Sequence, residues 1–216
     1  MRPQRFHRIR RVLERRQPDL TVLMERVHKP HNFSAILRNC DAVGVLEAHA
    51  VPPEDGLPVY RGTSGSASRW VEVRRHDAVV EAAAHLKEEG FQLVAAHPTP
   101  EAKGWTEVDY TRPTAFLVGT ELHGLTDEAL DLADEVVVLP MAGMVRSLNV
   151  SVATALLLYE AYRQRDEAGF YNRRRLTDDA YERLLFEWSY PRVAEALVEE
   201  GRPYPELGED GEILEM

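Results

Sequence analysis

Short apolar runs alternate with helical patterns through most of this chain, and this alternation constrains the fold more than any other feature. Where a helix follows a strand, it returns the chain to the edge of the sheet at which that strand began. A repeated strand–helix–strand order therefore predicts parallel strands with helices on both faces of the sheet. The expected strands cover residues 20–24, 46–51, 70–73, 91–96, 114–119 and 136–140. The expected helices cover about 31–43, 77–89 and 126–133, with a long helix from about 148. We therefore predict an α/β fold.

Two helical extensions flank this expected sheet. A first helix, ended by Pro18, places most of its arginines away from one apolar face, which is formed by Phe6, Ile9, Val12 and Leu13. Another amphipathic pattern runs from about residue 177 to 198. We expect three parts: a basic helix at 1–18, the α/β domain at 19–168, and a C-terminal helix with an acidic tail at 169–216.

The charge of the chain is unevenly distributed. The formal net charge of -10 disfavours a protein that coats nucleic acid through bulk charge. Residues 1–38, however, hold ten basic and three acidic side chains, whereas residues 195–216 hold eight acids and one arginine. This asymmetry predicts a polyanion-binding head and an acidic tail. The tail is interpreted either as a disordered solvating segment or as one that folds back over the arginine-rich first helix.

Several classes of protein are disfavoured by composition. No stretch reaches 18 apolar residues and no apolar segment follows the basic N-terminus, so we expect a soluble, cytoplasmic protein without a membrane span. Cys40 is the single cysteine, which excludes an internal disulfide and a four-cysteine zinc site, and we expect it to be buried. His28 and His31 have no carboxylate or thiol nearby in the sequence, so we expect no metal.

The loops after the strands are where an open parallel sheet binds its ligand. The segment GTELHGL at 119–125 has the glycine spacing of a phosphate loop, but Leu125 and Thr126 replace the lysine and hydroxyl residue of a nucleoside triphosphatase. GTSGSAS at 62–68 misses the spacing of a dinucleotide-binding loop. LPMAGMVRSLNVSVATALL at 139–157 is an apolar loop with a single charge, which suits either a core segment or a ligand loop.

Three of these segments together resemble a known family. HNFSAILRNCDAVG (31–44), FLVGTELHGL (116–125) and LPMAGMVRSLNVSVATALLL (139–158) are similar, in this order, to the three motifs of the SPOUT class of RNA methyltransferases. Within that class the chain most resembles the tRNA (guanosine-18) 2′-O-methyltransferase group over residues 20–165. The resemblance implies a C-terminal deep trefoil knot in the sheet domain, a topology that general connection rules disfavour.

The resemblance also implies the residues of the site. The expected cofactor is S-adenosylmethionine, held by Ala95, Gly119, Leu139, Met141 and Leu148. The expected catalytic residues are Asn32, Arg38, Glu121, Ser147 and Asn149. The expected RNA contacts are Arg5, Arg8, Arg11 and Arg15. Structural interpretations compete with these roles, because asparagine and serine also cap helices, arginine forms surface ion pairs, and a loop glutamate is commonly solvated.

The implied reaction methylates the ribose 2′-hydroxyl of guanosine 18 in tRNA, and the implied assembly is a homodimer with its active site at the subunit interface. Arg38 then acts either as a general base or as a group that orients the hydroxyl and binds phosphate, and the sequence leaves both open. Two alternatives also remain: methylation of ribosomal RNA or another tRNA ribose, and a non-catalytic RNA module that binds the cofactor.

Overall fold

The computed structural model describes residues 1–53, 69–120 and 123–214. The chain divides into two compact units, one formed by residues 17–168 and the other by residues 1–16 together with 169–216. The two terminal segments, which the sequence analysis treated as separate parts, belong to one unit.

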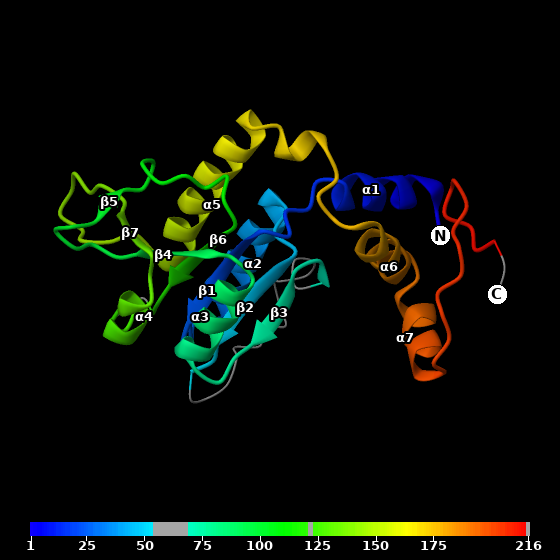
Figure 1. Ribbon diagram of the computed structural model, residues 1–216, viewed down its shortest axis with the longest axis horizontal. Helices are drawn as coiled ribbons and strands as arrows, with labels where there is room; N and C mark the ends of the chain where they lie inside the picture. The colour runs from blue at the N-terminus through cyan, green and yellow to red at the C-terminus, as the bar shows by residue number, and fades with distance from the viewer. Residues whose placement is uncertain (54–68, 121–122, 215–216) are drawn as a thin grey trace. The chain divides into compact units, whose positions relative to one another are not determined.

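The larger unit contains a seven-stranded parallel sheet with the strand order β3-β2-β1-β6-β4-β7-β5 (Figure 1). The strands are β1 (Leu20–Glu25), β2 (Glu47–Val51), β3 (Glu72–Arg75), β4 (Gln92–Ala96), β5 (Lys103–Gly104), β6 (Thr114–Val118) and β7 (Glu135–Val138). The predicted parallel sheet is confirmed. Strand β3 begins later than expected, and the short strand β5 was not predicted.

Helices cover both faces of the sheet, as predicted (Figure 1). Helices α2 (Pro30–Val43) and α5 (Val150–Glu167) pack on one face, and α3 (Val79–Glu88) and α4 (Asp127–Asp131) pack on the other. Side chains alternate across a strand, so Val22 of β1 joins the α2/α5 core whereas its neighbour Leu23 joins the α3/α4 core. The predicted burial of Cys40 is confirmed, since its exposed fraction is 0% in the α2/α5 core.

The C-terminal end of α5 is fixed to the sheet by one buried arginine. Arg165 donates from Nη1 to Asp19 Oδ1 at 2.7 Å and from Nε to the Tyr110 carbonyl at 2.9 Å. Its Nη2 donates to the carbonyls of Asp19 and Arg112, both at 2.9 Å. Asp19 precedes β1, and Tyr110 and Arg112 precede β6. One side chain therefore ties α5 to the amino ends of both central strands.

The smaller unit contains α1 (Pro3–Leu13), the 3-10 turn η2 (Phe170–Asn172), α6 (Asp178–Ser189) and α7 (Pro191–Glu199). The single helix expected at 177–198 is two helices, because Pro191 lacks an amide hydrogen and disfavours helical geometry at Tyr190. The expected apolar face of α1 is formed by Phe6, Ile9 and Leu13, whereas Val12 is 37% exposed. The expectation for Val12 was therefore wrong.

The acidic tail packs against the first helix. Gly211 is buried beside Phe6, with a φ of 83°, and a Cβ at this position would meet the Phe6 ring at 2.5 Å. Tyr190 donates its hydroxyl to the Gly211 carbonyl at 2.6 Å, and His7 Nε2 lies 3.0 Å from Asp210 Oδ1. The disordered tail was therefore a wrong expectation, and the alternative, a tail folded back on the first helix, is confirmed within the described residues.

None of the helices in the described ranges combines the length and apolarity needed to cross a membrane.

Candidate functional site

A cavity of about 280 Å³ opens where the carboxyl ends of β6, β4 and β7 meet. Neighbouring parallel strands end at the same edge of a sheet, so the loops that follow them converge there. The wall includes Ala96 from β4, Val118 from β6 and Val138 from β7. It is completed by residues from the second and third motif segments: Gly119, Thr120, His123, Gly124, Leu139, Met141, Arg146, Ser147 and Leu148. The structure therefore has a cavity at the sheet edge where the sequence analysis expects the ligand.

The second motif segment makes a tight backbone crossing at the cavity. Thr120 and Gly124 exchange two backbone hydrogen bonds of 2.9 Å. A Cβ at Gly119 would lie 2.0 Å from the Gly124 carbonyl oxygen, a distance at which atoms overlap. Gly119 therefore has a packing reason to lack a side chain, in addition to its place in the cavity wall.

A buried glutamate holds the end of this segment. Glu25, the last residue of β1, accepts from the Thr126 amide at 2.9 Å and from the Thr126 hydroxyl at 2.7 Å. Thr126 in turn caps α4 by accepting from the Ala129 amide. The chain after Gly124 is thus anchored to the central strand, and this fixes one wall of the cavity.

The third motif segment supplies the opposite wall from a chain without helix or strand between β7 and α5. Leu139, Met141 and Leu148 are half-buried and line the cavity, as the resemblance implied. Between them, Met144 is fully exposed and Val145 is 64% exposed. The segment is therefore apolar on the side of the cavity and also on part of its outer surface.

The first and third motifs meet through two asparagines. Asn149 donates from Nδ2 to Asn32 Oδ1 at 3.1 Å, and its own Oδ1 accepts from the Ser151 amide at 2.9 Å. Asn149 is thus the N-cap of α5, as its structural interpretation proposed, and also a partner of Asn32. Asn32 is 2% exposed and lies inside α2, whose N-cap is Lys29, so a capping role for Asn32 is excluded.

The remaining expected site residues differ in how the structure places them. Arg38 is exposed on α2, and Ser147 is exposed at the cavity wall. Glu121 and the segment 62–68 lie outside the described residues. Ala96 rather than Ala95 lines the cavity, because alternate residues of β4 face opposite sides of the sheet and the Ala95 side chain is buried in the α3/α4 core.

Four polar cavity residues were not identified from the sequence: His97, Thr120, His123 and Arg146. His97 and Thr120 each lie within two residues after a strand, which is a signal that the sequence pattern contained. His123 and Arg146 lie inside the second and third motif segments. They are among the polar residues in the wall of a mainly apolar cavity, a combination that is typical of small-ligand sites.

A separate basic surface lies on α1. The side chains of Arg5, Arg8 and Arg11 are exposed on this helix, opposite its buried apolar residues. Arg15 is also exposed, and its guanidinium lies 5.6 Å from the centroid of the Tyr171 ring. All four arginines expected to contact RNA are thus accessible to solvent in the smaller unit.

Comparisons with known proteins agree with the motif resemblance. The chain matches the SpoU rRNA Methylase family over residues 19–159 and the C-terminal SpoU rRNA methylase family over residues 163–216. It is 51% identical over 215 residues to an Escherichia coli (strain K12) protein named tRNA (guanosine(18)-2′-O)-methyltransferase, which covers 99% of this chain and 94% of that protein.

Two solved structures are similar to this one. The TrmH/SpoU tRNA modifying enzyme of A. aeolicus gives a TM-score of 0.82 at 43% identity, covering 88% of this chain and 97% of that chain. The SpoU methyltransferase AviRb from Streptomyces viridochromogenes, in complex with the cofactor AdoMet, gives a TM-score of 0.61 at 28% identity, covering 71% of this chain and 59% of that chain.

The close crossing at Gly119 leads to a first prediction. Replacing Gly119 with alanine forces residue 119 away from the backbone of Gly124, so we expect the free energy of unfolding to fall by about 1–3 kcal/mol, the usual cost of overpacking. Gly143→Ala is the matched control, because nothing lies within 4 Å of a Cβ there. Denaturant unfolding of both variants measures the effect, and equal stabilities would contradict the rigid crossing.

Proposed function

Because the chain belongs to the SpoU methylase family, we propose that it transfers a methyl group from S-adenosylmethionine to the ribose 2′-hydroxyl of guanosine 18 in tRNA. The observation that carries this proposal is the similarity, over nearly the whole chain, to an enzyme named for that reaction. We place the reaction in the cytoplasm, where tRNA is charged and used. Ribosomal RNA is the second candidate substrate, since the matching family is named for it.

The cavity residues fit S-adenosylmethionine. An adenosine moiety is bound by apolar contact and a few backbone groups, and Leu139, Met141 and Leu148 line the cavity beside the glycine crossing. We propose that these residues and Gly119 hold the adenosine. When bound, S-adenosylmethionine supplies an electrophilic methyl group on its sulfonium. A solved SpoU methyltransferase named as an AdoMet complex supports this assignment.

The proposed task of the chain's own residues is to position the 2′-hydroxyl and to stabilise the charge that develops on its oxygen. The Asn149–Asn32 hydrogen bond joins the start of α5 to α2, the helix that carries Arg38. An exposed guanidinium is suited to bidentate phosphate binding, and it is a poor base because it holds its proton tightly. We therefore propose that Arg38 binds the phosphate of the target nucleotide and stabilises the alkoxide. Ser147 and Glu121 remain proposed catalytic residues.

The active assembly is proposed to be a homodimer. Val152, Leu156 and Tyr159 follow one face of α5 and are 47%, 38% and 53% exposed. Met144 and Val145 of the cavity segment, which directly precedes α5, are also exposed and apolar. We propose that these five residues form one interface. A second copy of this chain would bury that surface, and Arg38 of one protomer would then serve the cavity of its partner.

Two further properties are proposed from the family. Residues 141–148 form the loop of a deep trefoil knot, which the similarity to the TrmH/SpoU structure supports. The arginines of α1 bind tRNA phosphates, a role supported by their exposure. The acidic tail lies in the same unit as α1, and its Asp210 pairs with His7 of that helix.

The proposed reaction is tested by nucleoside mapping. Purified protein is incubated with labelled S-adenosylmethionine and either unmodified tRNA or unmodified ribosomal RNA. The digested RNA is analysed by mass spectrometry for ribose methylation, at guanosine 18 in the case of tRNA. Label in ribosomal RNA alone would replace tRNA by the second candidate. The variant Arg38→Ala is expected to bind the cofactor as the native chain does but to transfer methyl groups about 10²–10³-fold more slowly, the usual effect of losing one charge-stabilising donor.

Calorimetry with S-adenosylmethionine tests whether Arg38 contributes to cofactor binding or only to methyl transfer. A loss of cofactor affinity equal to the loss of rate would move Arg38 into the cofactor site and contradict its proposed role. Arg192→Ala, which removes an exposed arginine on α7, is the control and should change neither quantity.

The basic surface of α1 is tested by the salt dependence of tRNA binding. Replacing Arg5, Arg8 and Arg11 with alanine removes three phosphate contacts, so the slope of log affinity against log salt should become shallower by about 2 to 3. The control triple variant replaces exposed arginines elsewhere in the same unit, Arg183, Arg192 and Arg202. Equal slopes for native chain and α1 variant would place the RNA contact elsewhere.

The homodimer is tested on α5. Leu156→Glu places a charge in the proposed interface, where burial of an unpaired charge is costly, and should convert the dimer to a monomer in sedimentation measurements. Val80→Glu on α3 is the matched control, because Val80 is likewise an outward apolar residue, 44% exposed, on the other face of the sheet. A native chain that sediments as a monomer contradicts the proposal directly.

A further inference from the structure

Three histidines converge at the β2/β3 side of the sheet. His49 lies on β2, His76 follows β3, and His85 lies on α3. Their ring centroids are 5.2 Å apart for His49 and His76, and 5.7 Å apart for each of the other two pairs. The side chains of His49 and His76 are 3% and 4% exposed, and that of His85 is 27% exposed. The strand order places β1 between this cluster and β6, so it is separate from the cavity.

The sheet geometry explains the convergence. Glu47 and His49 are two residues apart on β2, so both side chains face α3. The register pairs His49 with Arg74 of β3, and His76 is two residues further along the same face. Helix α3 packs over this face and presents His85 to the strands. The Glu47 carboxylate and the His49 imidazole of β2 thus meet the His85 imidazole of α3, and the His76 imidazole contacts His49.

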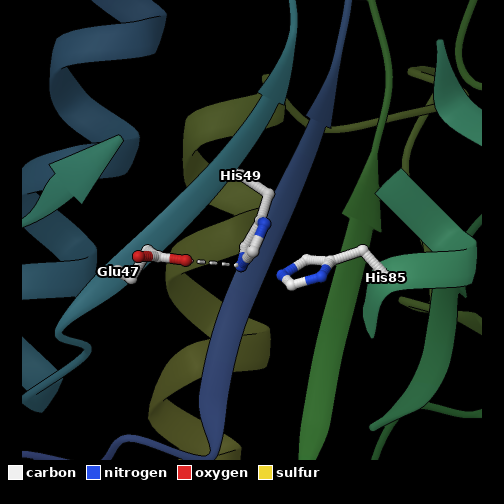
Figure 2. A group of neighbouring side chains, drawn as sticks. All are labelled: Glu47, His49 and His85. Atoms are coloured by element: carbon white, nitrogen blue, oxygen red, sulfur yellow. Dashed lines mark ion pairs between the residues drawn. The ribbon is translucent and has the colours of Figure 1, made fainter. Parts of the chain in front are cut away.

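The donor atoms lie close to the arrangement of a metal site. One oxygen of Glu47 and one nitrogen each of His49 and His85 all lie within 4.8 Å of one another. Figure 2 shows His49 between the other two groups, with its ring nitrogen directed at the Glu47 carboxylate. The His49 Nε2–Glu47 Oε1 distance is 3.4 Å. Two ligands of a tetrahedral zinc ion are separated by about 3.3 Å, given bond lengths near 2.0 Å.

We propose that Glu47, His49 and His85 bind one divalent transition-metal ion of the Zn²⁺ type, with water as the fourth ligand. Two imidazoles and one carboxylate are a ligand set that zinc accepts, and the three donor atoms already lie within 4.8 Å of one another. The ion would link strand β2 to helix α3.

His76 completes the site as a positioning residue. Its Nε2 lies 2.9 Å from His49 Nδ1, and its Nδ1 lies 4.0 Å from Glu81 Oε1. When His49 donates from Nδ1 to His76, the His49 Nε2 lone pair is directed at the space beside Glu47. Metal-binding histidines are usually held in this way by a partner on their second nitrogen.

Arg74 acts as an internal competitor for the ion. Its Nη1 forms a hydrogen bond to His85 Nε2, and its Nε lies 3.7 Å from Glu47 Oε1. The guanidinium therefore uses lone pairs that the ion requires. The Arg74 side chain is 45% exposed, and its Nη1 also lies 4.0 Å from Glu89 Oε1, so it can turn outward when the ion binds. Removal of Arg74 should thus favour metal binding, whereas removal of a ligand should oppose it.

The test measures Zn²⁺ binding to the full chain without cofactor or RNA, so its outcome is independent of the methyl transfer. The chelator-treated protein is titrated with Zn²⁺ against a chromophoric chelator. We expect one ion per chain, with affinity reduced at least about tenfold in both Glu47→Gln and His85→Ala. Arg74→Ala should bind Zn²⁺ several-fold more tightly. His7→Ala, which removes an exposed histidine of the other unit, is the control and should bind as the native chain does.

Thermal unfolding supplies a second measurement. Zn²⁺ should raise the unfolding temperature of the native chain and of Arg74→Ala, but not that of His85→Ala, because an ion that binds only the folded state stabilises it. Circular dichroism establishes that each variant is folded before titration. Equal Zn²⁺ affinity in the native chain and His85→Ala, or weaker binding in Arg74→Ala, would overturn the proposal.

Discussion

The buried guanidinium of Arg165 is the interaction on which the arrangement of the larger unit depends. It is fully buried, it carries a formal charge, and its donors are directed at the two chain segments that lead into β1 and β6. Loss of one partner of a buried charged pair typically costs about 3–5 kcal/mol, since the other charge remains desolvated. The C-terminal end of α5 is therefore anchored to the sheet. Its N-terminal end is capped by Asn149, which is hydrogen-bonded to Asn32 of α2. The cavity segment therefore connects β7 to a helix that is anchored at both ends.

Burial on both faces explains why the sheet was predictable. A strand such as β6 is buried at every residue and reads as an uninterrupted apolar run, which the sequence displays directly. Strand β5 has two residues, Lys103 and Gly104, and carries no such signal. The tail was misjudged for a related reason. Its composition is that of a solvated segment, but its order depends on a few tertiary contacts, such as Gly211 against Phe6.

The site was predictable only in part. The cavity residues Gly119, Leu139, Met141 and Leu148 followed from the motif resemblance, because no property of these residue types specifies a ligand. His97 lies directly after β4 and could have been identified from topology alone. The histidine cluster could not, because His49 and His85 are distant in sequence and only the packing of α3 on β2 brings them together. His28 and His31, by contrast, are close in the sequence, so they were the histidines examined as possible metal ligands.

The smaller unit combines residues 1–16 with residues 169–216, so it can be completed only after the larger unit has been synthesised. Residues 17–168 are synthesised as one continuous stretch and can fold as soon as they leave the ribosome. Helix α1 is synthesised before them, but the residues that pack on its apolar face, in α6 and around Gly211, are synthesised after them. The apolar face of α1 therefore lacks its packing partners until the residues after 168 have been synthesised.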